Sequence, residues 1–495
     1  MSRIIIQNGN LCELDLPLKF AQKLYNEFAI RHPNAFYLRT RQRGMQNWDG
    51  KIHYITKTGQ FKIGLLPKVY DMCIEMGIKP KVVDMRQPLP KVSKVVTNIG
   101  KYKLRPEQEK AVKSVINNRV GDTPFHIGVL DYTVNAGKTL IMSSLYLTYK
   151  KQLKTLLITN DSDWLNQARE EFKQYLPGED ITFVQGKVLN WSNFTIGMVQ
   201  SISRNMRFYQ KELSQIDMVL VDEADQGGSK QYQNVITRLF NTRIRIGLSG
   251  TIYMSKLAKD KVKNMNLECF FGKVIAEFKL KDSIKKGYST KTIVKMVPGK
   301  PWYGNWESDC ISYKEIYDDS ITENNTAWTM AYNRLRWNIN QGRYPALVVC
   351  KHIAHCENLY KFFKKKLGDA YNIAYVHVNT PSKLRQQIMG DFREGKIDIL
   401  VSTTIIARGK NFPKLRYLLN AASMDSQEKS IQFLGRLVRT DKSKKKVYLD
   451  DLHYPGPYLD RHGKHRKQYY QRQELKVILL DKLWKKHPNH SLIKS

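Results

Sequence analysis

Residues 127–139 read IGVLDYTVNAGKT, and residues 140–149 continue them as an apolar helical run. The segment at 127–130 predicts a buried strand, so the local order is strand, turn, helix. The turn ends in Ala136-Gly137-Lys138-Thr139. Glycine lets backbone N–H groups point toward a phosphate at the positive end of the next helix. This stretch therefore predicts an α/β fold with a phosphate site at the end of a strand.

The two residues after Gly137 have the chemistry that a nucleoside triphosphate requires. Lys138 is expected to contact the β- and γ-phosphates, and the Thr139 hydroxyl to ligate Mg²⁺. The complete phosphate-loop pattern has glycine five positions before Gly137, where this chain has Tyr132. On this stretch alone, an ordinary strand–turn–helix stays open.

A second motif, Asp222-Glu223-Ala224-Asp225, follows the apolar run at 218–221. Asp222 is expected to hold Mg²⁺ through water, and Glu223 to orient and deprotonate an attacking water. Two adjacent acids after a strand are common as solvated loop residues. Four residues in this order, downstream of a phosphate loop, favour the catalytic interpretation.

Residues 432–439 read QFLGRLVR and predict a cationic helix. Arg436 and Arg439 are three residues apart, so they would share one helix face. In a second lobe, such arginines stabilise transition-state charge at the γ-phosphate, an effect of about 10³–10⁵-fold in rate. Gln432 and Gly435 complete the motif. The alternative is a surface helix with two solvated arginines.

Residues 102–108, YKLRPEQ, precede the phosphate loop. Gln108 is placed to read the adenine edge through both of its amide groups, and Arg105 is assigned to the same site. A glutamine just after Pro106 is also an ordinary helix start, so this assignment depends on its position relative to the loop.

Ten short apolar runs alternate with helical patterns, five in each of two segments. They are residues 127–130, 155–159, 195–199, 218–221 and 244–248, then 346–350, 373–376, 399–401, 417–421 and 446–449. Continuous apolar runs between helices indicate buried parallel strands, hence two α/β lobes. The motifs lie at the carboxyl ends of these runs, where open α/β sheets bind ligands.

The predicted domains are 1–95, a small α+β domain; 96–270, the first lobe; 271–455, the second lobe with a connecting segment at 271–344; and 456–495, a basic helical tail. Residues 79–103, with three prolines and many lysines, predict a linker. Trp328, Ala331, Leu335 and Ile339 have helical spacing. In the tail, an apolar helical stripe is expected to pack on the second lobe; it consists of Leu475, Ile478, Leu479, Leu483 and Trp484.

The composition indicates a polyanionic partner. The chain has 82 Lys plus Arg against 45 Asp plus Glu, a net charge of +37. This excess favours nucleic acid as the partner over solubility alone. The six cysteines lack CxxC spacing, and packing is preferred to a zinc site at His352, His355 and Cys356. We find no signal peptide and no apolar run of membrane-spanning length, so we expect a soluble, cytoplasmic protein with no membrane partner.

The first 95 residues hold 16 basic and 7 acidic residues, a local charge of +9. Arg39, Arg41 and Arg43 alternate, so in a strand they would share one face. Asp49-Gly50 favours a tight hairpin. The hairpin would set these arginines and Lys51 against a phosphate backbone, with Trp48 stacking on a base or packing in the core.

As an ordered set, these motifs resemble the superfamily-two helicases over residues 104–451. The remaining members of the set are TLLITNDSDWLNQ at 155–167, IGMVQS at 196–201, SGT at 249–251 and STTIIARGKNFP at 402–413. The resemblance implies two RecA-like lobes that hydrolyse ATP with Mg²⁺ and move on nucleic acid. It assigns nucleic-acid contacts to Gln200, Ser201 and Thr403.

The same resemblance assigns coupling roles. Ser249, Gly250 and Thr251 would link the nucleotide state to closure of the lobes. Thr403, Gly409 and Asn411 would connect the nucleotide to the bound strand, with Gly409 and Asn411 counted in the ATP site. Asn411 stands where many relatives have Asp.

The motif details favour DNA over RNA. The RNA helicases named for the Asp-Glu-Ala-Asp tetrad have Ser-Ala-Thr and His-Arg-Ile-Gly-Arg, whereas this chain has SGT and QFLGR. Residues 43–51, 61–69, a helix ending near Gly77, and 461–467 are similar to the phage UvsW-like recombination helicases. That likeness implies junction branch migration, fork regression, and D-loop or R-loop unwinding in recombination, repair and replication.

Other interpretations stay open: a duplex translocase that does not separate strands, an RNA helicase, or a non-catalytic junction-binding or annealing protein. Phage recombination or single-strand-binding proteins are expected partners, and a monomer is favoured, in the cytoplasm of an infected host. Trp302 and Trp306 are candidates for a strand-separating wedge or, alternatively, core residues.

Overall fold

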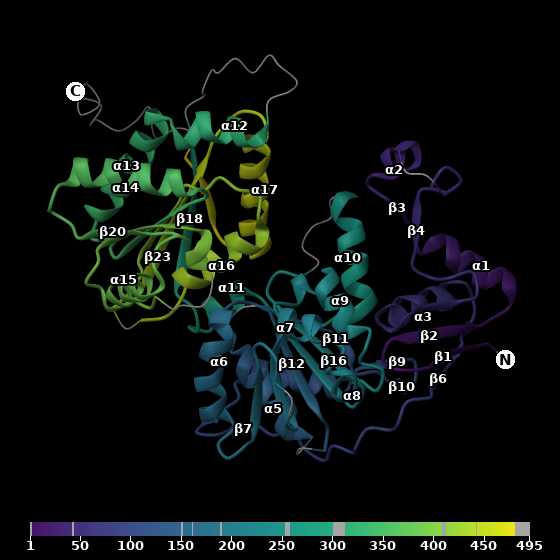
Figure 1. Ribbon diagram of the computed structural model, residues 1–495. Helices are drawn as coiled ribbons and strands as arrows, with labels where there is room; N and C mark the ends of the chain where they lie inside the picture. Colours follow the sequence, from purple (N-terminus) through teal and green to yellow (C-terminus); the bar gives the residue numbers. More distant parts are fainter. Residues whose placement is uncertain are drawn as a thin grey trace. The chain divides into compact units, whose positions relative to one another are not determined.

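The structure is a computed structural model that describes residues 2–41, 44–149, 152–160, 162–188, 191–252, 258–299, 312–407, 412–441 and 443–480. It divides into two compact units, Met1–Phe278 and Lys279–Ser495. Figure 1 shows a sheet flanked by helices in each of them. Arg43, Gly409, Asn411, Trp302, Trp306, Leu483 and Trp484 lie outside the described residues.

The first unit is built on a seven-stranded parallel sheet of order β13-β14-β12-β15-β16-β11-β17. Its strands are β11 (Ile127–Tyr132), β12 (Thr155–Thr159), β13 (Ile181–Val184), β14 (Phe194–Met198), β15 (Met218–Asp222), β16 (Ile244–Ser249) and β17 (Val274–Phe278). Strands β11, β12, β15 and β16 are buried at every residue, because both faces of the sheet are covered. All five runs predicted for this lobe are strands, and β13 and β17 are additional.

One helix of this lobe, α4, precedes the large sheet along the chain, and the others follow its strands. They are α4 (Pro106–Ile116), α5 (Lys138–Thr148), α6 (Ser162–Tyr175), α7 (Val199–Arg204), α8 (Gln210–Ser214), α9 (Lys230–Ile236) and α10 (Ala258–Phe271). The predicted linker is structured at both ends: Lys81–Asp84 is a strand, and β7 (Asn98–Ile99) pairs with β8 (Tyr102–Lys103).

The N-terminal part of the first unit is α+β. A four-stranded sheet of order β5-β2-β1-β6 joins β1 (Arg3–Ile6), β2 (Leu11–Asp15), β5 (Gln60–Lys62) and β6 (Lys81–Asp84). Helices α1 (Leu18–Glu27) and α3 (Leu66–Glu75) accompany it. A separate pair, β3 (Ala29–Arg31) with β4 (Lys51–His53), carries α2 (Ala35–Arg41) between its strands.

This arrangement corrects the predicted basic hairpin. Arg39 and Arg41 lie in helix α2, not in a strand, so a separation of two residues places them about 200° apart around the helix axis. Asp49-Gly50 does not close a tight hairpin, because the partner of β4 is β3, on the far side of α2. Asp49 Oδ1 instead accepts a hydrogen bond from the Lys51 N–H at 2.9 Å, a local turn.

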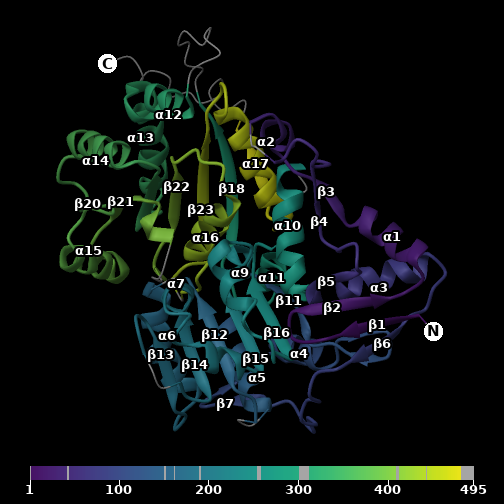
Figure 2. The ribbon, with the colours of Figure 1, turned by 45° about the vertical axis from the view of Figure 1, so that its right-hand side comes forward.

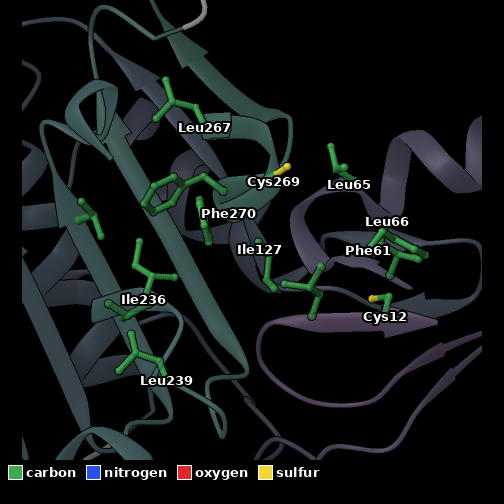
Figure 3. Packing of buried hydrophobic residues seen from close by; sticks show 14 of the residues in the cluster. Cys12, Phe61, Leu65, Leu66, Ile127, Ile236, Leu239, Leu267, Cys269 and Phe270 are labelled. Atoms are coloured by element: carbon green, nitrogen blue, oxygen red, sulfur yellow. The ribbon is translucent and has the colours of Figure 1, made fainter. Parts of the chain in front are cut away.

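The N-terminal sheet and the first lobe share one hydrophobic core. Figure 3 shows Leu65 and Leu66 on the N-terminal side and Ile127 and Cys269 on the side of the lobe, and all four are buried. Gly64 lies so close to the end of α10 that a Cβ there would collide with the Glu268 carbonyl oxygen. The contact therefore requires glycine, and the two sheets pack as one body within this unit.

Arg245 of β16 reinforces this junction. It is fully buried, and its guanidinium donates to Gly9 O at 2.6 Å, to Asn10 Oδ1 at 2.8 Å and to Phe270 O at 3.2 Å. Burial lowers the pKa of Arg245 to about 9, with Arg86 adding to the effect. A charged side chain thus connects the lobe to the β1–β2 turn through carbonyl and amide oxygens.

The second unit contains another seven-stranded parallel sheet, of order β20-β21-β19-β22-β23-β18-β24. Its strands are β18 (Lys291–Pro298), β19 (Ala346–Cys350), β20 (Ile373–Val376), β21 (Ile399–Thr403), β22 (Tyr417–Asn420), β23 (Lys446–His453) and β24 (Val477–Leu479). Its helices are α11 (Leu280–Lys285), α12 (Tyr313–Tyr317), α13 (Asn325–Ile339), α14 (Ile353–Leu367), α15 (Ser382–Glu394), α16 (Gln427–Leu437) and α17 (Leu459–Arg472). The five runs predicted for this lobe are all strands, and the helical spacing at 328–339 is α13.

The C-terminal segment belongs to this sheet. Helix α17 carries Arg466, which is fully buried and holds Asp451 of β23 through its Nη2 at 2.8 Å. The prediction of an apolar helical stripe is wrong, because Ile478 and Leu479 belong to a strand, β24, which pairs in parallel with β18. The backbone groups of an open sheet edge supply hydrogen bonds that a docked helix would not make.

The zinc alternative finds no support in the described residues, where no three His, Cys, Asp or Glu side chains gather as metal ligands. His355 is buried on α14, and its Nδ1 lies 3.2 Å from the Tyr317 hydroxyl. Burial, helped by His352, lowers the pKa of His355 to about 3, so the ring is neutral. None of the helices that the structure describes has the length and apolar character to cross a membrane.

Candidate functional site

The phosphate loop connects β11 to α5 at the carboxyl edge of the first large sheet. Gly137 is the N-cap of α5 with φ of 75°, and Asn135 also has positive φ, 66°. The Gly137 carbonyl accepts the N–H groups of Leu140 at 3.0 Å and Ile141 at 3.3 Å. The positive φ at position 137 favours glycine, and a Cβ there would also displace the Gln108 amide from the loop.

The Gln108 side chain, on α4, is hydrogen-bonded to this loop. It is 1% exposed; its Oε1 accepts the Arg105 N–H at 2.8 Å, and its Nε2 donates to Ala136 O at 2.8 Å. The amide therefore ties the start of α4 to the phosphate loop, a role that the sequence did not suggest. A second N–H and a second lone pair make adenine contact compatible with this geometry.

Tyr132 explains the departure from the complete loop pattern. It is the last residue of β11 and fully buried, and its hydroxyl donates to the Glu107 carbonyl at 2.8 Å. Where the complete pattern has glycine, this chain uses an aromatic side chain that fixes α4 against the sheet. The loop therefore keeps its Gly137-Lys138-Thr139 turn without the first glycine.

The acidic motif meets the same edge. Asp222 is the last residue of β15 and is 4% exposed, and Glu223 has positive φ of 52° as it turns the chain into the helical turn Ala224–Gln226. A non-glycine residue in this region stores backbone strain, which is frequent at active sites. The turn places the two acids consecutively at the end of the sheet.

Electrostatics links the two motifs. Burial lowers the pKa of Lys138, but the carboxylates of Glu223, Asp222, Asp225 and Asp131 raise it more, so the net pKa lies above its ordinary value. The ammonium is thus held charged among four acids. Such a set fits a site for Mg²⁺ and a triphosphate, because the metal balances the acids and the lysine balances the phosphate.

The Ser249-Gly250-Thr251 turn touches both motifs. Ser249 Oγ donates to Asp225 Oδ1 at 2.9 Å, accepts the Thr251 N–H at 3.1 Å, and lies 3.0 Å from Thr251 Oγ1. A Cβ at Gly250 would lie 3.1 Å from the Thr133 Cα, at the start of the phosphate loop. One turn at the end of β16 therefore contacts the acidic motif and the phosphate loop.

Gln200 and Ser201 lie on α7, directly after β14. Gln200 Nε2 donates to Asn160 O at 3.3 Å, and Ser201 Oγ accepts the Gly186 N–H at 2.9 Å. Both side chains therefore hold neighbouring loops at the edge of the sheet. Their predicted contact with nucleic acid stays a prediction.

In the second unit, Thr403 ends β21 and is 7% exposed. Gln432 and Arg436 lie on α16, but this helix ends at Leu437, so Arg439 does not share a helix face with Arg436 as predicted. The Arg439 backbone is held instead by Thr290, the residue before β18, whose hydroxyl donates to the Arg439 carbonyl at 3.2 Å. The approach of the two arginines to Lys138 stays a prediction.

The N-terminal candidates gather on the arm formed by residues 29–53, here called the β3–β4 arm. Arg39, Arg41 and Lys51 are exposed, whereas Trp48 is partly buried. Trp48 Nε1 donates to Lys51 O at 2.9 Å, and its ring meets His32 edge-on at 5.7 Å. Trp48 therefore packs within the arm, and its predicted stacking on a base stays a prediction.

Two residues near the acids were missed by the sequence analysis. Asp131, on β11, contributes to the raised pKa of Lys138; an acid in an apolar strand was the available signal. Tyr232, on α9, is 1% exposed, and burial together with Asp222, Asp225 and Glu223 raises its pKa. Nothing in the sequence pattern distinguishes Tyr232 from an ordinary core aromatic.

Comparison with known proteins adds independent information. The family described as "Type III restriction enzyme, res subunit" matches residues 101–254, and "Helicase conserved C-terminal domain" matches residues 331–441. Together they span more than half of the 495 residues. The first match contains the phosphate loop, the acidic tetrad and the Ser-Gly-Thr turn, and the second contains Arg436 and Arg439.

A protein of Sulfolobus islandicus filamentous virus (isolate Iceland/Hveragerdi), named as a helicase, is 22% identical over 385 residues, 71% of this chain and 64% of that protein. The chain thus spans less than two thirds of this curated relative. An S. cerevisiae Dbp5 variant bound to RNA and ADP BeF3 has a TM-score of 0.52 at 14% identity, covering 77% of this chain and 91% of that one.

The crystal structure of T4 UvsW covers 97% of this chain and 98% of that chain at 18% identity, with a TM-score of 0.45. The two family matches fall on the motifs of the two parallel sheets. The chain belongs to the superfamily-two helicases.

Proposed function

We propose that this protein hydrolyses ATP with Mg²⁺ and uses the energy to move along and remodel branched DNA. The observation that carries the proposal is the meeting of Lys138 with the acidic tetrad at the end of one parallel sheet, linked through Ser249. The chemistry follows from these residues.

Each residue has a distinct role at the phosphates. Lys138 binds the β- and γ-phosphates through its charged ammonium, and Thr139 with Asp222 would hold the metal ion. When bound, Mg²⁺ neutralises charge that develops on the phosphate oxygens. Glu223 orients the attacking water and takes its proton, because its carboxylate stands next to Asp222 on the same turn.

The second lobe is proposed to complete the site. Arg436 and Arg439 would stabilise transition-state charge at the γ-phosphate. Loss of that phosphate would remove the bridge between the lobes, and alternate closing and opening would move the protein along one strand. The Ser249–Asp225 hydrogen bond gives this cycle a physical link from the acids to the Ser-Gly-Thr turn.

Charge and motif details support DNA as the substrate. The net charge of +37 favours sequence-independent binding to phosphate. The Ser-Gly-Thr and QFLGR motifs resemble DNA-directed helicases, and the basic N-terminal part resembles the UvsW-like group, which acts on branched DNA. RNA remodelling is the second candidate, favoured by the Asp-Glu-Ala-Asp tetrad. Recombination or single-strand-binding partners and a monomeric state stay predictions.

The test is nucleic-acid-stimulated ATP hydrolysis by the full chain. Lys138→Ala and Glu223→Gln should abolish turnover while DNA binding persists, whereas Lys173→Ala, on the exposed surface of α6, should behave as wild type. Four-way junctions, forks, single strands and RNA of matched length then rank the substrates. Normal turnover by Glu223→Gln would refute the assigned base, and stimulation by RNA alone would refute the DNA assignment.

A further inference from the structure

Helix α2 exposes two aromatic side chains that no core uses. Phe36 is 80% exposed and Tyr37 is 55% exposed, among the most exposed large apolar residues that the structure describes. Figures 1 and 2 show α2 at the end of the β3–β4 arm, away from the N-terminal sheet. Contiguous exposed apolar surface marks interaction sites, and these two side chains are neighbours on one helix.

The inner side of α2 packs against other residues of the arm, so the helix cannot turn its outer side inward. Ala35 is buried, and Gly50, with φ of 77°, approaches it so closely that a Cβ at position 50 would lie 3.2 Å from the Ala35 Cβ. Ala35 and the half-buried Leu38 therefore define the inner side. Helical spacing places Phe36 and Tyr37 outward, and Arg41 is exposed beside Tyr37.

Charge identifies the kind of partner. Residues 29–53 hold five basic residues and one acidic residue, Asp49. The Asp49 carboxylate already has a partner within the arm, because it lies 2.6 Å from His53 Nε2. Arg41 stacks over the Tyr37 ring at 4.9 Å, a cation–π pair at the surface. Aromatic rings interleaved with arginine are the chemistry that binds unpaired bases and their phosphates.

The arm is anchored at its base to the ATPase lobe. The His53 ring stacks on Tyr25 with centroids 4.0 Å apart and planes 11° apart, which ties β4 to α1. Tyr54 donates its hydroxyl to Asn266 Oδ1 of α10 at 3.0 Å. A base held by α2 would therefore be held by the same unit that carries the phosphate loop.

We propose that Phe36 and Tyr37 stack on unpaired bases where single strands leave a duplex, with Arg41 on the adjacent phosphate. This proposal rests on the proposed function, and it adds the element that recognises the branch point. Stacking acts on any base, because every base has a π-face, so recognition depends on unpaired bases and not on sequence.

The test compares affinities of the full chain for a fork with single-stranded arms and for a blunt duplex of equal length. Phe36→Ala with Tyr37→Ala should weaken fork binding on the order of tenfold or more, while blunt-duplex binding and DNA-independent ATP hydrolysis stay at wild-type values. Tyr37→Phe should retain fork binding. A 2-aminopurine placed at the branch should lose its protein-induced quenching only in the double variant.

Phe208→Ala is the matched control, because Phe208 is 57% exposed in the same unit with Lys187 Nζ 3.8 Å from its ring centroid. Unchanged fork affinity in the double variant would overturn the inference, as would equal losses on fork and duplex. Loss of self-association or of binding to a single-strand-binding protein, with fork affinity intact, would assign the patch to a protein partner. A wild-type protein that binds no nucleic acid would instead defeat the proposed function.

Discussion

Removal of the Ser249 hydroxyl should separate ATP hydrolysis from strand remodelling. Ser249 is fully buried, and its bond to Asp225 is assisted by the charge of the carboxylate. A hydrogen bond to a charged group contributes about 1.5–3 kcal/mol. If that bond transmits the state of the acidic motif, Ser249→Ala should lower the number of base pairs opened per ATP hydrolysed by about 10- to 100-fold. Lys138 and Glu223 should continue to turn over ATP in this variant.

The measurement is the ratio of base pairs opened to ATP hydrolysed on a forked DNA, with single-turnover hydrolysis recorded in parallel. Ser144→Ala is the control, because Ser144 is also fully buried and its hydroxyl donates to Val96 O at 2.6 Å, remote from the acids in sequence and function. Ser144→Ala should lose less stability in denaturant, about 0.5–1.5 kcal/mol, because its acceptor is a neutral carbonyl. A wild-type ratio for Ser249→Ala would refute the coupling role of this turn.

Gly64→Ala should destabilise the first unit by at least about 2 kcal/mol, because its Cβ would meet the Glu268 carbonyl; denaturant midpoints measure this. The folded pKa of His355 is near 3, below its unfolded value, so the unfolded state binds the proton more tightly. The free energy of unfolding should therefore fall as the pH decreases from 6.5 to 3, by up to about 1.4 kcal/mol per pH unit. Acid titration of wild type against His355→Gln checks this slope. Replacing Arg39 and Arg41 by glutamine should reduce the salt dependence of DNA binding by about 0.7–0.9 in slope for each phosphate that is no longer neutralised, measured by affinities from low to high salt.

Each of these predictions has its own control and contrary outcome. Gly228→Ala should be mild, because its Cβ would lie 3.6 Å from Leu267, an ordinary contact; equal effects at positions 64 and 228 would contradict the close approach. An unchanged acid slope in His355→Gln would show that other groups control acid unfolding. An unchanged salt slope after replacement of both arginines would remove the arm from the DNA path.

Local signals predicted most of the fold. Ten apolar runs became strands because central parallel strands are buried on both faces, and this leaves a continuous apolar pattern that needs no knowledge of the partner strand. The phosphate loop was equally local, since the conformation of Gly137 is a property of one turn. Roles that require the two units together, such as those of Arg436 and Arg439, stay predictions.

Weak or non-local signals failed. The alternation of Arg39 and Arg41 suggested a strand, but both side chains are exposed, so no burial pattern distinguished a strand from the helix α2 that the structure shows. Ile478 looked helical by spacing, yet the open edge of β18 drew its segment into the sheet as β24. For β24 the deciding partner, β18, lies far away along the chain.

The sequence by itself determined the two parallel sheets and the phosphate-binding turn, because strand burial and turn conformation are recorded in consecutive residues. Only the tertiary structure decided that Arg245 and Gly64 join the N-terminal sheet to the first lobe, that Ser249 bonds Asp225, and that α2 turns its aromatic rings outward. These contacts join residues from separate segments of the chain, and their energies depend on distances that no local pattern encodes.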